Sequence, residues 1–531
     1  MKHSIIIIQV FIVAAIFTST SCTKFLQETP KSNMPASEYY QTTEQALSAL
    51  NYLYDKGTGI PSFYSVRGGL YDASNSFTFD NMSGLANNVV AQNTSIRNFA
   101  SLTQGPDNCA NYLGGIWRNF YSSIADANSI IANVENNGNI NAEAQKKILA
   151  TAKFFRAANY YYLIRLFGAV PLILKPYTSL DNIYMPRTSV DSVYNSITED
   201  LNWALTNGML ADVPMGFNGN NISRGTVQVM LSEVYLTMAG YPLQKGVEYY
   251  KKALNTAKEL LNSGGGYALF TSSGRLTPFD KLRLSDYDKG SEYLFFIEYD
   301  PSIQQSPFPQ YSFPNTFPSP IPSTNLKIQY SLVLSTWTPS TQLLKMYDSA
   351  NDIRRHEKQF YSTSFVYKST ASSDDTAISF SAMPYRWYDS AALFMTGASG
   401  KYTAIYRMAD AYLIAAEAAN ELGEDPTPYL QPIIHRAYIN MPAIPGDAAG
   451  RKNFILAERC RELAMEGHFW FDMLRTRLYP DVSGTNPTFS ALIGHSNGRG
   501  QFYTTKDLLL PLPPTEMQRN PNLQPQNPMY E

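Results

Sequence analysis

The stretch NAEAQKKILATAKFFRAANYYYLIRLFGAVPLI, residues 141–173, decides the fold class of this chain. Gly168 followed by Pro171 near its end is a helix stop signal. Before that signal, apolar side chains recur at the spacing of one helix face, at Ile148, Ala152, Phe155, Tyr162 and Leu166. The sequence therefore predicts a long amphipathic helix from Asn141 to Gly168.

Similar patterns predict further helices on both sides of this one, over 37–56, 115–135, 190–205, 224–239, 247–262, 403–422, 430–440 and 452–477. Several neighbouring helices have short connections, and helix pairs of this length can stack as tetratricopeptide-type repeats. No strict repeat of about 34 residues is visible, so we expect degenerate repeats.

Two stretches between the helices lack helical periodicity. Residues 301–340 are rich in Pro, Ser, Asn and aromatic residues, and residues 57–106 are also loop-like. Disordered linkers are poor in aromatic residues, whereas long ordered loops usually carry function. Just before the later loop, residues 292–299 (EYLFFIEY) form a compact apolar run that predicts a buried strand.

The first 22 residues indicate export. Lys2 and His3 precede an apolar run over 5–17, which is too short for a bilayer span of about 20 residues but suits a cleaved signal. Small residues then lead into Cys22, as in a bacterial lipoprotein signal. Ser19 stands where such signals usually carry Leu, so a plain secretory signal with an incidental cysteine remains the alternative. We expect a signal peptide over 1–21 and a lipid anchor at Cys22.

The composition describes a globular chain that does not bind nucleic acid. Of its 531 residues 44% are hydrophobic and 16% charged, and the net charge of −2 gives no basic footprint. Aromatic residues make up 13%, with 37 Tyr, which suits a rigid core or a surface that grips polar ligands. Apart from Cys22, the cysteines are Cys109 and Cys460, and a disulfide between them is possible in an oxidising compartment.

The sequence gives no positive case for an enzyme or a metal site. Glu458, Glu462 and Glu466 lie at i, i+4 and i+8, as a glycosidase pair could, but ion pairing along the helix with the nearby arginines explains them better. His468 and Asp472 have no partner set for a transition metal. Residues 286–290 (DYDKG) resemble the start of a calcium loop without its later ligands, and we interpret them as a turn.

Segments along the whole chain together resemble one family. They are Phe25–Asp55, Ala152–Ile173, Ser223–Gly240, Glu458–Arg477 and Leu508–Pro528. In this combination they are similar to the SusD/RagB family of Bacteroidetes outer-membrane nutrient-binding lipoproteins. Cys460 departs from the basic or small residue usual in the family. Residues 23–25 lack the acidic cluster that often marks surface export, so the residues alone leave the membrane leaflet open.

The resemblance implies a mostly α fold, in which tetratricopeptide-like helix pairs form a scaffold and a loop-rich irregular part with few short strands carries the ligand site. We expect one SusD-like domain over 22–531, with the scaffold over about 37–290 and 403–478 and loop-rich insertions over about 57–106 and 300–400. Such proteins are not enzymes and use no cofactor. They are anchored by lipid to the outer membrane, where we expect this chain to face the extracellular side. They deliver oligosaccharides, or in some members peptides, to a SusC-like TonB-dependent transporter.

The aromatic loops supply the candidate ligand contacts. Sugar rings have apolar faces that lie on aromatic side chains, and their hydroxyls need amide, carboxylate or guanidinium partners. In the resembled family equivalent stretches build the site, which here gives Arg67, Tyr71, Asp72, Asn75, Tyr311, Phe313 and Trp337. For Trp337 a core role competes with ligand contact. A peptide binder, a lipid-anchored hydrolase and a purely structural scaffold remain the competing functions.

Overall fold

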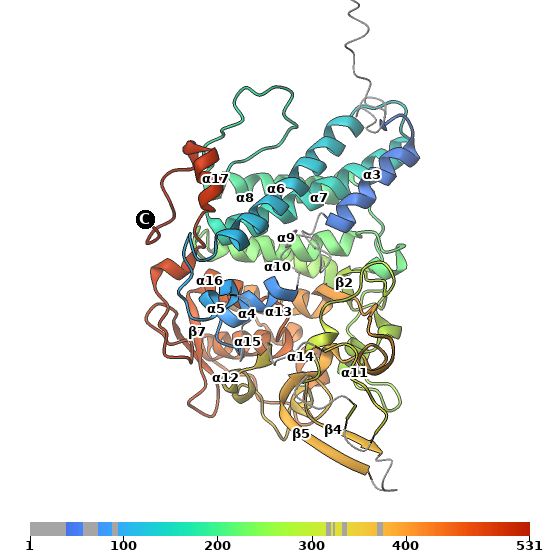
Figure 1. Ribbon diagram of the computed structural model, residues 1–531, viewed down its shortest axis with the longest axis vertical. Coiled ribbons are helices and arrows are strands. Elements are labelled where there is room, and N and C mark those ends of the chain that lie inside the picture. The colour runs from blue at the N-terminus through green and yellow to red at the C-terminus, as the bar shows by residue number, and fades with distance from the viewer. Residues whose placement is uncertain are drawn as a thin grey trace, which may run out of the picture.

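The structure is a computed structural model that describes residues 39–56, 73–87, 94–314, 320–321, 324–331, 337–368 and 375–531. The predicted signal peptide and the predicted anchor Cys22 lie outside the described residues. Figure 1 shows the chain as an elongated body in which long helices occupy one end and loops with a β hairpin the other.

The helix predicted from residues 141–173 is confirmed as α7, Ala142–Phe167. The side chain of Asn141 caps its start by accepting hydrogen bonds from the backbone N–H groups of Glu143 (3.0 Å) and Ala144 (3.1 Å). Gly168 ends it with a φ of 72°, and a Cβ there would lie 3.0 Å from Leu509. The helix therefore stops where its sequence signal predicts, against the C-terminal segment.

The longer helices pack one after another into a continuous stack. They are α3 (Thr43–Lys56), α6 (Ala110–Val134), α7, α8 (Val190–Asn207), α9 (Arg224–Ala239), α10 (Val247–Leu261), α13 (Met408–Glu421), α14 (Thr427–Ala437) and α15 (Ala448–Glu462). Each helix from α6 to α9 contacts the next, α10 contacts α13, and α13 contacts both α14 and α15. The stack joins the two sequence-distant helical blocks and confirms the mostly α fold built of helix pairs.

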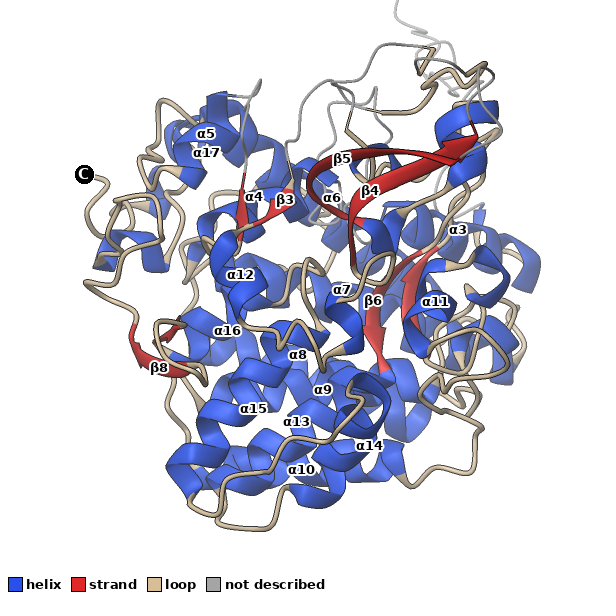
Figure 2. Cartoon of the chain, turned by 90° about the horizontal axis from the view of Figure 1, so that it is seen from below, coloured by secondary structure: helices blue, strands red, loops and turns tan. Residues whose placement is uncertain are grey.

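Short elements complete the fold. The shorter helices are α4 (Ala73–Met82), α5 (Thr94–Ala100), α11 (Pro278–Arg283), α12 (Thr341–Lys345), α16 (Phe469–Thr476) and α17 (Pro514–Arg519). The strands are β1 (Ala86–Asn87), β2 (Tyr293–Ile297), β3 (Thr338–Pro339), β4 (Tyr361–Lys368), β5 (Asp375–Pro384), β6 (Thr403–Arg407), β7 (Leu478–Asp481) and β8 (Thr488–Ala491). Within the described ranges they form separate antiparallel pairs, β1–β3, β2–β6, β4–β5 and β7–β8 (Figure 2).

Two predicted helices are wrong in part. Residues 403–407 form β6 rather than the start of a helix, because the predicted strand β2 is fully buried and its backbone needs a hydrogen-bonding partner. The predicted helix over 452–477 is two helices, α15 and α16. Between them Met465 (φ 60°) and Gly467 (φ 80°) adopt left-handed conformations that a helix cannot contain. The hairpin β4–β5 lies in a region predicted to be loop-rich.

Five arginines and five carboxylates among the described residues form one buried ionic network. Its members are Arg354, Arg386, Arg407, Arg436, Arg461, Asp352, Glu292, Glu458, Glu462 and Glu466. Ion pairing of the three glutamates is thus confirmed, but the prediction that it runs along the helix is wrong for most pairs. Glu458 and Arg461 pair within α15 at 2.8 Å, whereas Glu462 contacts Arg354, Arg407 and Arg436 from other segments.

The network sets the charge state of its acids. Burial alone would raise the pKa of Glu458, but Arg354 and Arg461 lower it to about 2. In the same way Arg386 and Arg407 overcome the effect of burial and lower the pKa of Glu466 to about 2. These carboxylates are therefore ionised, fully paired and closed to solvent.

In the structure the two described cysteines do not pair, and the side chains considered as metal ligands have other partners. Cys109 and Cys460 are both buried and unpaired. His468 faces Asp410 at 3.7 Å rather than joining Asp472. Asp288 forms an ion pair with Lys401. Across the described residues, no cluster of three or more His, Cys, Asp or Glu side chains could hold a metal ion, and none of the helices is long and apolar enough to cross a membrane.

Candidate functional site

The structure brings the two predicted loop regions together. β1 belongs to the early loop region and β3 to the end of the later loop, and the two strands pair. Ala86 lies opposite Pro339, and Asn87 lies opposite Thr338. The backbone N–H of Ser340 also donates to the carbonyl of Leu85 at 2.8 Å. The two stretches that the sequence analysis assigns to one site are thus neighbours in space.

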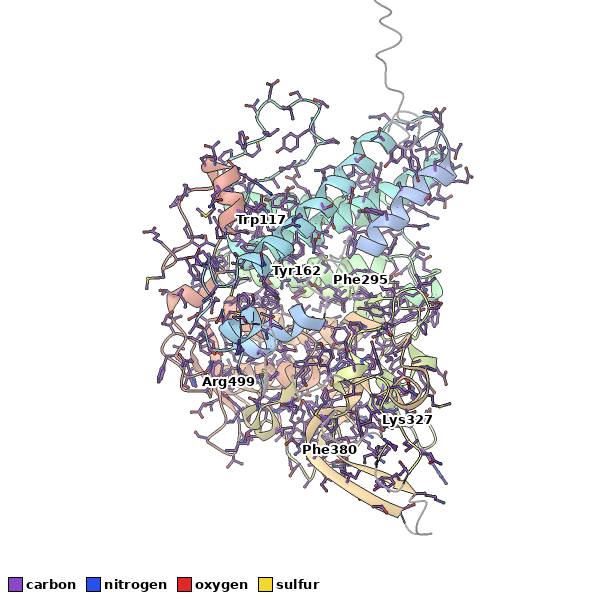
Figure 3. The ribbon with its side chains drawn as sticks, in the orientation of Figure 1. Trp117, Tyr162, Phe295, Lys327, Phe380 and Arg499 are labelled. Carbon is purple, nitrogen blue, oxygen red and sulfur yellow. The ribbon has the colours of Figure 1, made fainter. Side chains whose placement is uncertain are left out.

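An arginine near the C-terminus forms hydrogen bonds with the backbone of the early loop region. Arg499, labelled in Figure 3, donates from Nη1 to the carbonyls of Ala100 (3.2 Å) and Asn81 (3.4 Å), and from Nη2 to the carbonyl of Ala86. Nearby, the hydroxyl of Tyr503 donates to the carbonyl of Met82 at 2.7 Å. The described parts of the early loop region are therefore hydrogen-bonded to residues near the C-terminus.

The predicted aromatic contacts of the later loop are buried. Trp337 has no exposed surface, and its ring centroid lies 6.3 Å from that of Trp387, 6.0 Å from Phe308 and 6.4 Å from Tyr311. This packing is that of an aromatic core. It favours the core role for Trp337 and leaves its ring and that of Tyr311 no open face for a sugar in this arrangement.

Phe313 belongs to a different, smaller cluster. Its ring packs edge-on against Phe365 of β4 at 5.2 Å and Phe380 of β5 at 5.8 Å, and it too is buried. The ring thus attaches the later loop to the β hairpin. Direct ligand contact by Phe313, as by Tyr311 and Trp337, remains a prediction.

The structure describes only part of the early loop region, and the predicted contacts there lie mostly outside that part. Arg67, Tyr71 and Asp72 lie outside the described residues. Asn75 lies on α4, whose backbone is described there without its side chain. The residues predicted to line the early side of the site therefore stay predictions.

Asp80 on α4 is a buried carboxylate beside the aromatic core. Burial raises the pKa of its carboxyl to about 7, against the lowering influence of Trp337, His468 and Arg386. A carboxyl group with a raised pKa binds its proton more tightly in the folded state than in the unfolded chain. The protonated carboxyl of Asp80 therefore stabilises the fold at low pH, and this single contribution is lost as the pH rises from about 4 to 7.

We expect Asp80→Asn to remove this pH dependence. Relative to the variant, the wild-type free energy of unfolding should fall by up to about 1.4 kcal/mol for each pH unit between pH ~4 and ~7. Urea denaturation of both proteins across this range measures the difference. Asp425→Asn is the control, because Asp425 is exposed with a lowered pKa and stays ionised throughout the range. Parallel curves for Asp80→Asn and wild type would contradict the assignment.

A pocket of about 350 Å³ lies at the roots of both loop regions. α3, which leads into residues 57–72, contributes Asn51 and Tyr54, and β2, which leads into the later loop, contributes Phe296 with Glu298 just beyond. The third wall is a turn that includes Asn220. Elements far apart in the sequence thus line one cavity with amide, carboxylate and aromatic groups.

The turn over 218–221 (NGNN) orients the polar groups of this pocket. Gly219 (φ 61°) and Asn220 (φ 62°) both have left-handed backbones, which Gly adopts freely and Asn tolerates. Nδ2 of Asn220 then donates to the carboxylate of Glu298 at 2.6 Å, and the hydroxyl of Tyr402 donates to the other oxygen. Oδ1 of Asn220 has no hydrogen-bond partner among the described residues, and each carboxylate oxygen of Glu298 can accept a further hydrogen bond.

Aromatic rings surround these polar groups. The ring of Phe296 stacks on Tyr402 with centroids 5.2 Å apart and planes 28° apart. Phe217 ends the short 3₁₀ helix Met215–Phe217, in the chain between Met215 and Gly219, which both line the pocket, and its side chain is 63% exposed. An exposed ring beside fixed hydrogen-bonding groups is the combination that a sugar requires.

None of the residues that line this pocket is among the ligand contacts predicted from the sequence. The run NGNN is its available signal, because consecutive Asn and Gly residues favour a left-handed turn that projects amides. Glu298 lies near the end of the apolar run 292–299. This run predicts a strand, but it does not indicate a role for the carboxylate of Glu298. Tyr54, Asn220 and Glu298 are far apart in the sequence, so no local pattern indicates that they line one pocket.

Comparisons with known proteins agree with the fold. A family model described as "SusD family" matches residues 324–530, and one described as "Starch-binding associating with outer membrane" matches residues 24–236. SusD-like protein P2 of Formosa agariphila is 27% identical over 550 residues, which cover 98% of each chain.

Solved structures extend this similarity. A SusD superfamily protein from Parabacteroides distasonis aligns with a TM-score of 0.79 and 26% identity, over 92% of this chain and 99% of that one. A laminarin-binding SusD-like protein aligns with a TM-score of 0.69 and 20% identity, over 92% of this chain and all of the other, which shows the shared fold. The two family models match successive parts of the chain, these long alignments agree with them, and the chain belongs to the SusD family.

Proposed function

We propose that the protein is a surface lipoprotein, anchored through Cys22, that binds a glycan and delivers it to a SusC-like TonB-dependent transporter. The family description supports starch binding at the outer membrane, and the name of one structural neighbour gives laminarin as its ligand. The single observation that carries the proposal is the pocket at the roots of the two loop regions, which combines Asn220 and Glu298 with the rings of Tyr54 and Phe296. The exposed ring of Phe217 lies on the chain between the lining residues Met215 and Gly219, and we propose that it extends this surface.

The proposed ligand path starts at this pocket and continues over the loops. The predicted contacts Arg67, Tyr71, Asp72 and Asn75 come after α3 in the sequence, and α3 supplies Tyr54 to the pocket. In this proposal the buried aromatic core around Trp337 supports the loops from below. A glycan chain longer than the pocket would then contact the pocket and the early loop together.

Binding without hydrolysis is the chemistry that the described carboxylates support. Glycoside hydrolysis needs two carboxyl groups that face each other across a cleft. The described lining of the pocket holds one, Glu298, and the glutamates at 458, 462 and 466 are ion-paired and closed to solvent. We therefore infer a receptor that leaves its ligand chemically unchanged.

A glycan titration tests the proposed site. We expect the purified protein to bind laminarin or starch, and Asn220→Ala, Glu298→Gln and Phe217→Ala each to weaken binding roughly 10-fold, since each removes one hydrogen bond to a sugar or one stacking face. Isothermal calorimetry or affinity electrophoresis provides the measurement.

Phe502→Ala is the matched control for Phe217→Ala, because Phe502 is similarly exposed, at 60%, but is distant in the sequence from every residue that lines the pocket. Unchanged affinity in all three pocket variants would exclude the pocket as the glycan site while leaving family membership intact. Binding of oligopeptides in place of every glycan would establish the competing peptide-receptor function.

A further inference from the structure

A second pocket, of about 340 Å³, lies where the family-like segments of the sequence converge. The end of α7 supplies Arg165, α9 supplies Thr237, and the segment around α16 supplies Phe471, Leu474 and Arg477. The C-terminal segment closes the pocket with Leu508 and Leu509. None of its described lining residues belongs to the loop regions of the proposed glycan site.

The walls of this pocket are mostly apolar. Aliphatic and aromatic side chains from four segments line it, namely Ile164, Val190, Tyr194, Phe471, Leu474, Leu508 and Leu509. Its volume lies within the range of about 300–1,000 Å³ usual for small-molecule sites. The pocket opens beside Tyr241 and Pro242, which are exposed. An apolar molecule of modest size can therefore enter it from solvent.

The charged side chains of the pocket are all cations. Arg165, Arg475, Arg477 and Lys506 line it, and its described lining includes no aspartate or glutamate. Arg165 is paired with Glu233 at 3.5 Å, and Arg475 is paired with Glu417 and Asp472. The charges of these two arginines are therefore compensated by carboxylates that do not line the pocket.

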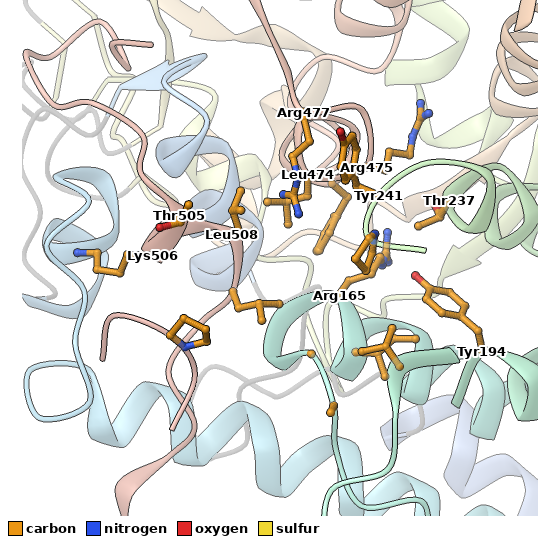
Figure 4. A pocket seen from close by; sticks show the side chains of 18 residues that line it. Arg165, Tyr194, Thr237, Tyr241, Leu474, Arg475, Arg477, Thr505, Lys506 and Leu508 are labelled. Carbon is orange, nitrogen blue, oxygen red and sulfur yellow. The ribbon is translucent and has the colours of Figure 1, made fainter. Parts of the chain in front are cut away.

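Arg477 is different, because its guanidinium has no carboxylate partner in the described part of the chain. Nη1 of Arg477 is buried and has no hydrogen-bond partner among the described residues, and its nearest aromatic contact is the ring of Tyr241 at 5.1 Å. Burial lowers the pKa of Arg477, which means that its charge is incompletely compensated. Figure 4 shows Arg477 near Leu474 and Tyr241, whereas Lys506 extends away from them. Nζ of Lys506 donates to the carbonyl of Leu102 at 2.8 Å.

We propose that this pocket binds a small amphipathic carboxylate, with the carboxylate on the guanidinium of Arg477 and the apolar body against Phe471, Leu474 and Leu508. A carboxylate would supply the hydrogen bonds that Nη1 lacks, and charge-assisted bonds of this type are strong. The apolar walls favour an alkyl or aryl body and disfavour inorganic phosphate or a free sugar, which would lose water without replacement partners. Medium-chain fatty acids and arylalkanoates belong to this class.

Calorimetry with decanoate and 3-phenylpropanoate tests the proposal, decanoate being kept below its micelle concentration. We expect wild-type protein to bind at least one of these probes and to bind decan-1-ol, which has no charge, at least 10-fold more weakly. Arg477→Gln should weaken carboxylate binding roughly 10- to 100-fold, with little effect on decan-1-ol. The melting temperature of the variant in the absence of probe verifies that it is folded.

Lys147→Gln is the matched control, because Lys147 is an exposed cation on the first turns of α7, far from the pocket at the other end of that helix. It should bind both probes as wild type does. Absence of binding by either probe, equal affinity of Arg477→Gln and wild type, or equal affinity for decanoate and decan-1-ol would each overturn the proposal. Glycan affinity should be unchanged in Arg477→Gln, so the outcome is independent of the proposed glycan site.

Discussion

Replacing Arg407 by Met is expected to lower the free energy of unfolding by about 3–5 kcal/mol, the cost of leaving buried carboxylates without their partner. Arg407 has no exposed surface. Its guanidinium contacts Glu292 at 2.7 Å, Glu462 at 3.1 Å and Glu466 at 2.6 Å. Met has a similar length but supplies neither charge nor hydrogen bonds, so the three carboxylates would lose compensation together.

The position of Arg407 explains why the effect should be global. Glu292 immediately precedes β2, Arg407 ends β6, and Glu462 ends α15. The contacts therefore tie the first helical block, the returning chain after the loop-rich part, and the second helical block to each other. Loss of this connection should loosen the whole domain.

Urea denaturation followed by circular dichroism measures this effect. Lys147→Met is the control, because Lys147 pairs with Glu143 at 2.7 Å on the exposed surface, and such pairs contribute at most about 1 kcal/mol. The double variant Arg407→Met/Glu466→Gln should recover part of the lost stability, because it removes one of the uncompensated charges. Equal denaturation midpoints for Arg407→Met and wild type would contradict the role assigned to the network.

The helical scaffold could be predicted from sequence because its information is local. Asn141 and Gly168 are a capping residue and a stop signal that act within one turn, and α7 begins and ends at them. The break between α15 and α16 also has a local signal, Gly467, but the strong apolar pattern on both sides of it conceals the interruption. Local patterns thus predict that helices exist better than they predict where they end.

The site and the network could not be predicted in this way because they depend on distant residues. β6 is a strand because β2 needs a partner, although its own sequence continues into a helix. Glu462 suggests intrahelical pairing, yet its three arginine partners come from other segments. The proposed glycan pocket combines Tyr54, Asn220 and Glu298, and no periodicity relates these positions.

We expect buried aromatic residues such as Trp337 to stabilise the fold and exposed ones such as Phe217 to contact the ligand. Substitutions of Trp337 test the first expectation. Trp337→Ala is expected to lower the free energy of unfolding by about 3–5 kcal/mol, because it removes a fully buried ring from a cluster with Phe308, Tyr311 and Trp387 and leaves a cavity. Trp337→Phe should retain more of this stability, since it keeps a ring in place.

Phe217→Ala should show the opposite behaviour. Because Phe217 is largely exposed and lies on the chain between Met215 and Gly219, which line the proposed glycan pocket, its removal should change stability by no more than about 0.5 kcal/mol while weakening glycan binding. Denaturation and glycan titration of both variants, at a temperature where each is folded, provide the comparison. Lost binding with unchanged stability in Trp337→Ala would instead mean that its ring contacts the ligand, as the sequence alone allows, and that the aromatic core opens when ligand binds.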